Sequence, residues 1–310
     1  MRKTINHITA LKGQKPIVCL TAYTAPVART FDLHCDLLLV GDSVAMVLYG
    51  EPSTLQADME MMIRHGRAVQ KSTQNAMVVI DMPFGTYQGS KETAFDNAAR
   101  IMKETGAAAV KMEGGSEMAE TVSYLAQRAV PVMGHVGLQP QSVNTMGGFK
   151  TQGRDEESAA KILADAKAIA QAGAFAIVVE GVPETLAADI TKAVSCPVIG
   201  IGASAQCDGQ ILVGEDMLGF TGGPYPKFVK TYADLNAAMD RAVTDYARDV
   251  RMRTFPAKDQ MYQTTEGKQP DVNIQAAEIP PMKLSLEPLP EPLPEKTGFF
   301  DPVLRATKRF

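Results

Sequence analysis

The sequence has few cysteines, and it lacks the long apolar and basic runs of membrane proteins and nucleic-acid-binding proteins. Its four cysteines show no C-x-x-C spacing, and Cys19, Cys35 and Cys196 stand in apolar surroundings. This favours reduced core thiols over disulfides or a zinc site. No stretch approaches the roughly 18 apolar residues of a membrane helix, and no apolar secretion segment follows the first residues. These absences predict a soluble cytoplasmic protein without a membrane partner.

The charges are nearly balanced, and two nucleotide-binding motifs are missing. Lys and Arg number 31 against 35 Asp and Glu, which gives a net charge of −4 and leaves no basic stripe for nucleic acid. No G-x-G-x-x-G follows the first apolar run, and no G-x-x-x-x-G-K-[ST] occurs. The apolar share of 45% is enough for a sizeable core, in one large domain or two ordinary ones.

Proline is concentrated at the carboxyl end of the chain. Nine of the 19 prolines fall from Pro256 onward, and residues 280–294 read PPMKLSLEPLPEPLP, a composition that favours extended chain. Residues 231–250 just before this segment carry apolar side chains at helical spacing. We therefore expect a compact domain over 1–255, ending after this helix, and a Pro-rich tail over 256–310 that is extended or disordered.

Short apolar runs alternate with longer stretches of helical period between residues 15 and 225. Runs that are apolar at consecutive positions are typical of strands covered on both faces. They cover residues 16–22, 37–42, 76–81, 108–114, 131–137, 174–181 and 197–203, with a weaker eighth in 211–219. Helices are expected over residues 58–71, 91–104, 116–128, 156–172 and 183–193. A period of about 30 residues favours a (β/α)8 TIM barrel, with an open doubly wound sheet as the alternative.

Five successive apolar runs end in, or carry near their ends, a residue able to do chemistry. In a β/α barrel the carboxyl ends of the strands meet at one mouth, so residues far apart in the sequence surround one cavity. The residues concerned are Asp42 and Ser43, Asp81, Lys111 and Glu113, His135, and Glu180.

Each of these residues also has a purely structural interpretation. Asp42 and Asp81 could cap helices or form turns. Lys111 and Glu113 lie two apart on one strand and could neutralise each other. His135 could be a hydrogen-bonded core histidine. Taken together the structural interpretation is weaker, because each buried uncompensated charge costs several kcal/mol.

A mouth lined by carboxylates with one histidine and no thiolate is an oxygen-rich site. Such a site suits Mg²⁺, with Mn²⁺ or Co²⁺ as substitutes, and the ion would leave positions open for a chelating substrate such as a 2-oxo acid. The ion would polarise the ketone, and a carboxylate farther around the rim would remove the neighbouring proton. Glu180 is the candidate for this base, although it could instead cap a helix or form a salt bridge.

One connecting segment is unusually long for a loop of this fold. Residues 138–154, LQPQSVNTMGGFKTQGR, have no apolar period and carry three glycines. A loop of this length between a strand and a helix usually has a function. We expect it to cover the substrate, with a plain surface insertion as the alternative.

Eight strings in order along residues 15–255 resemble the ketopantoate hydroxymethyltransferase family. Any one of them would be a weak signal, but their common order makes chance similarity improbable. They are LLLVGDS (37–43), DMPF (81–84), VKMEGG (110–115), GHVGLQPQSVN (134–144), GGFKTQGR (147–154), PVIGIGA (197–203), CDGQILV (207–213) and PKFVK (226–230).

The resemblance implies a one-carbon transferase in the first committed step toward pantothenate. In that family a TIM barrel transfers a one-carbon unit from 5,10-methylenetetrahydrofolate to 3-methyl-2-oxobutanoate, giving 2-dehydropantoate through a Mg²⁺-stabilised enolate. The resemblance implies one Mg²⁺ per subunit and a homo-oligomer, decameric rings being common in the family. The alternatives are a Mg²⁺-dependent aldolase or lyase acting on another 2-oxo acid, and a catalytically silent barrel that serves as a binding module.

The resemblance also implies a role for each residue at the predicted mouth. The metal ligands match Asp42, Asp81 and Glu113, with Glu113 acting directly or through water, and the proton acceptor matches Glu180. The substrate contacts match Asp42, Ser43, Asp81, Lys111 and His135.

Overall fold

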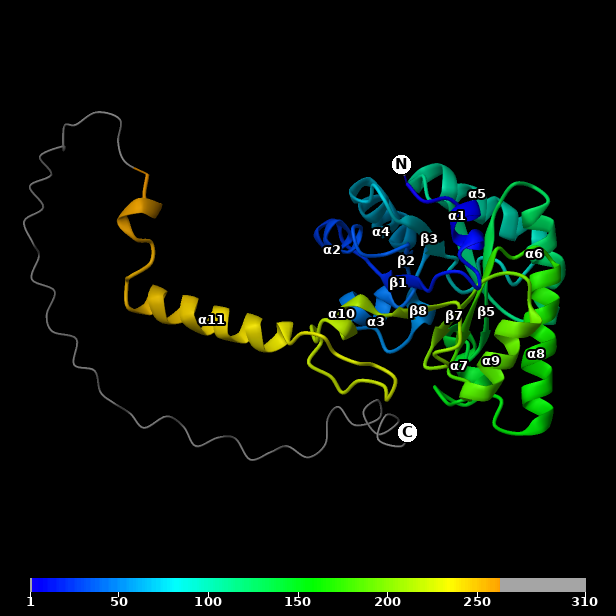
Figure 1. The fold of residues 1–310 in the computed structure, drawn as a ribbon. Coiled ribbons are helices and arrows are strands. Elements are labelled where there is room, and N and C mark those ends of the chain that lie inside the picture. The colour runs from blue at the N-terminus through cyan, green and yellow to red at the C-terminus, as the bar shows by residue number, and fades with distance from the viewer. Residues whose placement is uncertain (1, 263–310) are drawn as a thin grey trace, which may run out of the picture. The chain divides into compact units, whose positions relative to one another are not determined.

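Residues up to Asn236 are built around a closed barrel of eight parallel strands (Figure 1). The structure, a computed structural model, describes residues 2–262. Each strand pairs with the next along the chain, and β1 pairs with β8, so the predicted TIM barrel is confirmed and no open sheet forms. The strands are β1 (Ile17–Thr21), β2 (Leu37–Val40), β3 (Met77–Asp81), β4 (Ala109–Glu113), β5 (Val132–Gly137), β6 (Ala176–Glu180), β7 (Val198–Ile201) and β8 (Gly209–Leu212).

Helices follow most of the strands and lie outside them (Figure 1). The five expected helices are confirmed as α4 (Met59–Ser72), α5 (Lys91–Thr105), α6 (Ala119–Ala126), α8 (Glu156–Gln171) and α9 (Glu184–Ala193). Several begin at a side-chain cap, as where the Asp58 carboxylate accepts the Met61 N–H at 2.7 Å. The remaining helices are α1 (Ile5–Ala10), α2 (Ala25–Phe31), α3 (Val44–Tyr49), α7 (Val143–Met146), α10 (Gly214–Met217) and α11 (Leu235–Arg251).

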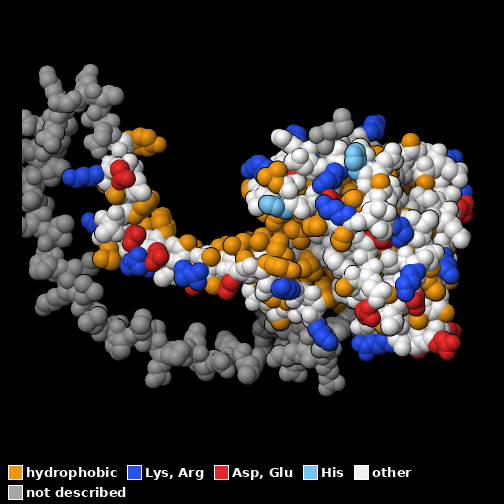
Figure 2. Space-filling model, in the orientation of Figure 1, with side chains coloured by type: hydrophobic (Ala, Val, Ile, Leu, Met, Phe, Trp, Pro, Cys, Tyr) orange, Lys and Arg blue, Asp and Glu red, His pale blue; other side chains and the backbone are white. Residues whose placement is uncertain are grey.

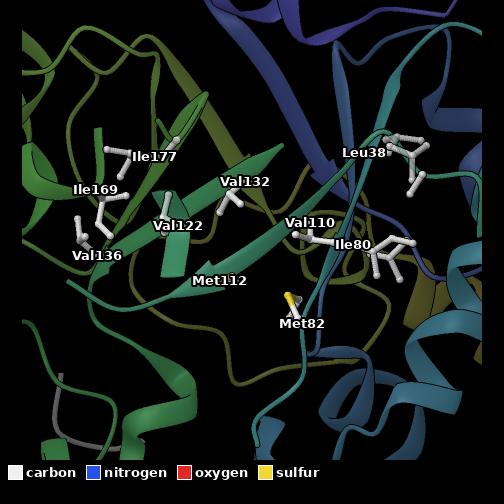
Figure 3. Packing of buried hydrophobic residues seen from close by; sticks show 14 of the residues in the cluster. Leu38, Ile80, Met82, Val110, Met112, Val122, Val132, Val136, Ile169 and Ile177 are labelled. Carbon is white, nitrogen blue, oxygen red and sulfur yellow. The ribbon is translucent and has the colours of Figure 1, made fainter. Parts of the chain in front are cut away.

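Alternation along the strands divides the apolar core into two layers. One set of side chains fills the barrel and includes Met77, Val79 and Ala109. The set of opposite parity faces the helices, and Figure 3 shows Ile80, Val110 and other members of this outer layer from close by. The strands therefore read as continuous apolar runs because both of their faces are buried.

Helix α8 packs closely on β5 because Gly134 has no side chain. A Cβ at this position would lie 2.4 Å from a methyl carbon of Ile169 on α8. Ile169 also lies near Val136 and Ile177 in Figure 3. A larger residue at Gly134 would thus push the helix away from the sheet.

The last strand lies earlier in the chain than the sequence pattern predicts. β8 covers Gly209–Leu212, whereas the sequence pattern predicts a strand within 211–219. That range overlaps β8 only at its first residues and also contains the helical turn α10 (Gly214–Met217). A Cβ at Gly209 would lie 2.5 Å from the Ile17 carbonyl oxygen, so the strand begins where a glycine permits close approach to β1. Residues 202–208 join β7 to β8 without a helix, so no helical pattern marks the start of β8 in the sequence.

Helix α11 confirms the helix expected over 231–250, although it begins at Leu235. Contacts between residues separate residues up to Asn236 from the part of the chain that follows, and the domain boundary expected near 255 stays a prediction. No residue of α11 is buried, and its apolar side chains lie along one edge of the helix (Figure 2). Most of the expected tail, residues 263–310, lies outside the described residues. Within residues 2–262 no helix is both long and apolar enough to cross a membrane.

Candidate active site at the carboxyl end of the barrel

The inward-facing positions of the strands change from apolar to charged toward the carboxyl end of the barrel. Asp81 follows Val79 at the same parity on β3, and His135 and Glu180 hold the corresponding places on β5 and β6. Each apolar layer inside the barrel is thus followed by polar groups at the mouth. The active sites of TIM barrels lie at this end.

Asp42, Asp81 and Lys111 are in direct contact. Asp81 and Lys111 are cross-strand partners on β3 and β4, and the Asp81 Oδ1 atom lies 3.0 Å from the Lys111 ammonium. The other oxygen, Asp81 Oδ2, accepts the backbone N–H of Asp42 at 3.1 Å. Lys111 therefore makes its close ion pair with Asp81 on the neighbouring strand, while the charge of Glu113 also acts on it.

Glu113, His135 and Glu180 form a second group that lies beside the first. Glu113 and His135 are cross-strand partners on β4 and β5, with 3.6 Å between Oε1 and Nδ1. On the other side of the ring, His135 Nε2 lies 3.2 Å from Glu180 Oε2. Among the described residues neither ring nitrogen has a well-directed hydrogen-bond partner. The histidine is thus held between two carboxylates rather than fixed by core hydrogen bonds.

None of the predicted acids has the helix-capping role that the sequence left open. The N-cap of α3 is Ser43, and its hydroxyl makes no cap bond but lies 2.8 Å from the Tyr23 hydroxyl. The N-caps of the helices that follow β3 and β6 are Ser90 and Pro183. The carboxylates of Asp42, Asp81 and Glu180 are therefore not used as helix caps and can bind a ligand or transfer a proton.

A glycine allows the Asp42 backbone to approach β3. A Cβ at Gly41 would lie 2.8 Å from Ser43 Oγ and 3.6 Å from Asp81 Oδ2. The turn after β2 brings the Asp42 N–H to Asp81 because the preceding residue has no side chain.

Gln141 and Tyr87 complete the mouth, and sequence reasoning missed both. The Gln141 side-chain amide donates to Asp42 Oδ2 at 2.8 Å, and its backbone N–H donates to Glu113 Oε2 at 3.0 Å. The Tyr87 hydroxyl donates to Gln141 Oε1 at 2.7 Å. Gln141 lies within the string GHVGLQPQSVN and just after β5, and these were the only signals that could have identified it.

Burial controls the electrostatics of the acids. Asp42 is 4% exposed, and burial followed by repulsion from Asp81 raises the pKa of its carboxyl to about 7. Burial and the charge of Asp42 also raise the pKa of Glu113 above its ordinary value. Burial lowers the pKa of Lys111, but Asp81 and the other acids outweigh it, so the net shift is upward and the ammonium stays charged.

His135 is the neutral member of the group. Burial and the nearby Lys111 charge lower the pKa of its ring below the ordinary value, in opposition to Glu180, which raises it. Near neutral pH the imidazole is therefore uncharged and can act as both donor and acceptor.

The donor set fits a divalent cation by charge and by atom type. One ammonium, that of Lys111, is grouped with four acids at the mouth, and it already pairs with Asp81 Oδ1 at 3.0 Å. A hard cation with oxygen ligands would offset the excess negative charge. Within the described residues no three Asp, Glu, His or Cys side chains yet form a ligating group, so binding would require the carboxylates to turn toward the ion.

The long loop reaches the mouth at two points. Gln141 near its start contacts Asp42 and Glu113, and the Gln152 N–H near its end donates to the Gly181 carbonyl at 2.9 Å, directly beside Glu180. A separate cavity of about 220 Å³ lies at the opposite, amino end of β1 and β8, lined by residues 13–16 and 206–208. That cavity lies at the other end of the barrel from the acids, so the mouth is the candidate active site.

Solved structures with the same fold include several enzymes at low sequence identity. A phosphonomutase-like protein from Burkholderia cenocepacia J2315 aligns with a TM-score of 0.55 at 18% identity, covering 81% of this chain and all of the other. A 2,3-dimethylmalate lyase of the PEP mutase/isocitrate lyase superfamily aligns with a TM-score of 0.53 at 15% identity, covering 85% and 93%. At these identities the similarity establishes the barrel fold alone.

Relatives found by sequence match this chain at much higher identity than these solved structures do. The chain is 59% identical over 259 residues to the 3-methyl-2-oxobutanoate hydroxymethyltransferase of Ruegeria sp. (strain TM1040), covering 84% of this chain and 92% of the relative. It is 59% identical over 262 residues to the enzyme of that name from Rhizobium rhizogenes, covering 84% and 96%. The family model for ketopantoate hydroxymethyltransferase matches residues 2–258. The chain therefore belongs to the ketopantoate hydroxymethyltransferase family and is a transferase.

Proposed function

We propose that this enzyme transfers a one-carbon unit from 5,10-methylenetetrahydrofolate to 3-methyl-2-oxobutanoate, giving 2-dehydropantoate in pantothenate synthesis. Family membership and the names of the relatives support the overall reaction. The observation that best supports the proposed proton transfer is the position of Glu180. Its side chain is 15% exposed at the rim, whereas those of Asp81 and Glu113 are 3% exposed, so it is the acid a substrate carbon can reach.

Asp42, Asp81 and Glu113 are the residues that would hold a Mg²⁺ ion. When bound, the ion would act as a Lewis acid on the keto group of the substrate. The Lys111 ammonium attracts the substrate carboxylate electrostatically, and the Ser43 hydroxyl, held by Tyr23, offers a donor beside Asp42. His135 supplies a neutral imidazole next to the reacting carbon. These residues bind and orient the 2-oxo acid.

Glu180 is the base of the proposed reaction. Its carboxylate takes the C3 proton of 3-methyl-2-oxobutanoate, and the electron pair of the broken C–H bond moves into the enolate of the substrate. The C3 carbon then attacks the methylene carbon of the folate, and one C–N bond of that methylene breaks. Water then displaces the second nitrogen and supplies the hydroxyl group, and the protons from C3 and from water go to the two nitrogens of the departing tetrahydrofolate. The His135 Nε2 atom lies beside this carboxylate, 3.2 Å from Glu180 Oε2.

The proposal extends to the setting of the enzyme. Residues 1–255 form the catalytic domain, and the loop 138–154 covers the bound substrate. A homo-oligomer is proposed from family membership. A cytoplasmic location is supported by four cysteines that are all buried and unpaired.

A coupled assay tests the proposal. The enzyme is incubated with 3-methyl-2-oxobutanoate, methylenetetrahydrofolate and Mg²⁺, and 2-dehydropantoate is measured with and without a chelator. We expect product only when both substrates and the divalent ion are present. Product formation from free formaldehyde at the same rate, without folate, would contradict the proposal in favour of an aldolase.

A further inference from the structure

Gln141 lies at the centre of the mouth and connects four strand ends. It belongs to a short turn, Pro140–Ser142, that follows β5, and it is 5% exposed. Its amide nitrogen donates to Asp42 Oδ2 at 2.8 Å and to the Met82 carbonyl at 2.9 Å. Its backbone N–H donates to Glu113 Oε2 at 3.0 Å. One uncharged residue thus holds an acid that follows β2 and an acid at the end of β4.

Backbone groups determine which way the Gln141 amide points. The Glu113 N–H can only donate, and it donates to the Tyr87 hydroxyl at 3.1 Å, so the Tyr87 proton is directed to Gln141 Oε1. On a second path, the Gly85 N–H donates to Gln88 Oε1 at 2.8 Å, which turns the Gln88 amide nitrogen toward Gln141 Oε1 at 3.0 Å. With two donors on its oxygen, Gln141 must present its nitrogen to Asp42.

This arrangement holds one oxygen of each carboxylate, about which the other oxygen can turn toward an ion. The bond from Gln141 occupies Oδ2 of Asp42, and among the described residues no hydrogen bond occupies Oδ1. Glu113 is held in the same manner through Oε2, with Oε1 facing His135. Each acid therefore has one oxygen held by Gln141 and a second oxygen that Gln141 leaves unoccupied.

We propose that Gln141 is a positioning residue that orients Asp42 and Glu113 for a divalent cation and couples the loop 138–154 to that site. This inference rests on the proposed function. A neutral donor suits the position because the site already holds an excess of negative charge, which a cationic side chain would neutralise without leaving room for an ion. Groups that orient the ligands of a metal typically change its affinity by 10- to 100-fold when they are removed.

The test compares Gln141→Ala with Gln139→Ala, a matched control in the same turn. The Gln139 side chain contacts Ser142 within the loop, at 3.4 Å, and neither acid. Mn²⁺ binding to the metal-free proteins is measured by electron paramagnetic resonance, and Mg²⁺ by competition. We expect the affinity of Gln141→Ala to be at least about tenfold weaker and that of Gln139→Ala to stay within about twofold of the wild type. Equal affinities in both variants would overturn the proposal.

Kinetics separate positioning from a loss of folding. We expect the Mg²⁺ concentration for half-maximal activity of Gln141→Ala to rise about tenfold, while kcat at saturating Mg²⁺ stays within about threefold of the wild type. A loss of kcat that Mg²⁺ does not restore, without a change in metal affinity, would contradict a positioning role. The Mn²⁺ measurement needs no substrate, so it tests the inference even if the wild type forms no 2-dehydropantoate.

Tyr87→Phe provides a second variant that keeps the buried ring. It removes the hydroxyl that directs the Gln141 amide and that accepts the Glu113 N–H, while Gln88 still supplies a donor to Gln141. We expect metal affinity to fall by about threefold, less than in Gln141→Ala, and the double variant to be no weaker than Gln141→Ala alone. Fully additive losses in the double variant would show that Tyr87 does not act through Gln141, and would overturn this part of the proposal.

Discussion

The two ends of the barrel interior are built from the same strands and have opposite chemistry. At the amino end, Met77, Val79 and Ala109 are fully buried and apolar. At the carboxyl end, the same faces of β3 and β4 carry Asp81 and Lys111, which are also almost fully buried. The strands therefore form a stable apolar layer at the amino end, next to charged groups at the carboxyl end that are costly to bury.

This difference explains where stability and function reside. Burying apolar side chains contributes about 1.5–3 kcal/mol each, whereas each uncompensated buried charge costs several kcal/mol. A protein selected for stability alone would have apolar side chains in both halves. The proposed cation and 2-oxo acid would account for the excess of acids at the mouth, so substitutions at the mouth should reduce activity and those at the amino end should not.

Replacing the base should have the largest effect on activity. Glu180→Gln keeps the shape of the side chain and removes the proton acceptor, so we expect kcat to fall about 10³-fold, which corresponds to about 4 kcal/mol in the barrier. Exchange of the substrate C3 proton in deuterated water should be lost to the same degree, while Mg²⁺ affinity stays nearly unchanged. Exchange at the wild-type rate would show that another residue is the base.

Breaking the buried ion pair should have the next largest effect. Lys111→Met leaves Asp81 buried without its cation, so we expect the free energy of unfolding to fall by about 4 kcal/mol, together with loss of activity. Urea denaturation in the absence of metal measures this. Lys91→Met, which removes an exposed pair with Glu120, is the control and should leave the free energy of unfolding nearly unchanged, because solvent screens this pair. Similar losses of stability in both variants would show that the buried pair at the mouth contributes no more to stability than an exposed pair.

A cavity at the amino end should reduce stability without reducing catalysis. Met77→Ala removes a fully buried side chain, so we expect about 3 kcal/mol of lost stability. The kcat of the folded enzyme should stay within about twofold of the wild type, as measured at a temperature well below its midpoint of unfolding. A large fall in kcat would show that the two ends of the barrel are not independent.

The pH dependence of stability should show a smaller effect at the mouth. Because the folded protein raises the pKa of Asp42 to about 7 from an ordinary value near 4, Asp42 stabilises the fold below pH 4. That stabilisation is lost as the pH rises through about 7, so the metal-free protein should lose about 2 kcal/mol between pH 5 and pH 8. Urea midpoints in a chelating buffer measure the change. Asp42→Asn should reduce the slope of this profile, leaving the part due to Glu113, whose pKa is also raised, and an unchanged slope in that variant would assign the effect to another group.

The sequence predicted the barrel and most of the mouth for one physical reason. Strands buried on both faces must be apolar at consecutive positions, so runs such as 76–81 are readable without any structure. The charged residues at the ends of these runs, including Asp81 and Glu180, stand out against that background. Parallel topology then brings them to one rim, as the structure shows for the contacts among Asp42, Asp81 and Lys111.

Other features depend on information that is not local. The pairing of Lys111 with Asp81 rather than Glu113 follows from the register of β3 and β4, which the sequence pattern does not specify. Gln141 is a neutral residue in a loop without periodicity, and its importance appears only through the partners that surround it. In α11 the apolar stripe predicted a helix but not what it packs against, because amphipathicity does not identify a partner.

Isothermal titration of Mg²⁺ into the metal-free protein tests the central claim most directly, namely that the buried acids of the mouth share one cation. The account predicts one Mg²⁺ per chain in the wild type and loss of that binding in Asp81→Asn, with the barrel still folded by circular dichroism. Absence of binding in the wild type, or equal binding in the variant, would contradict it.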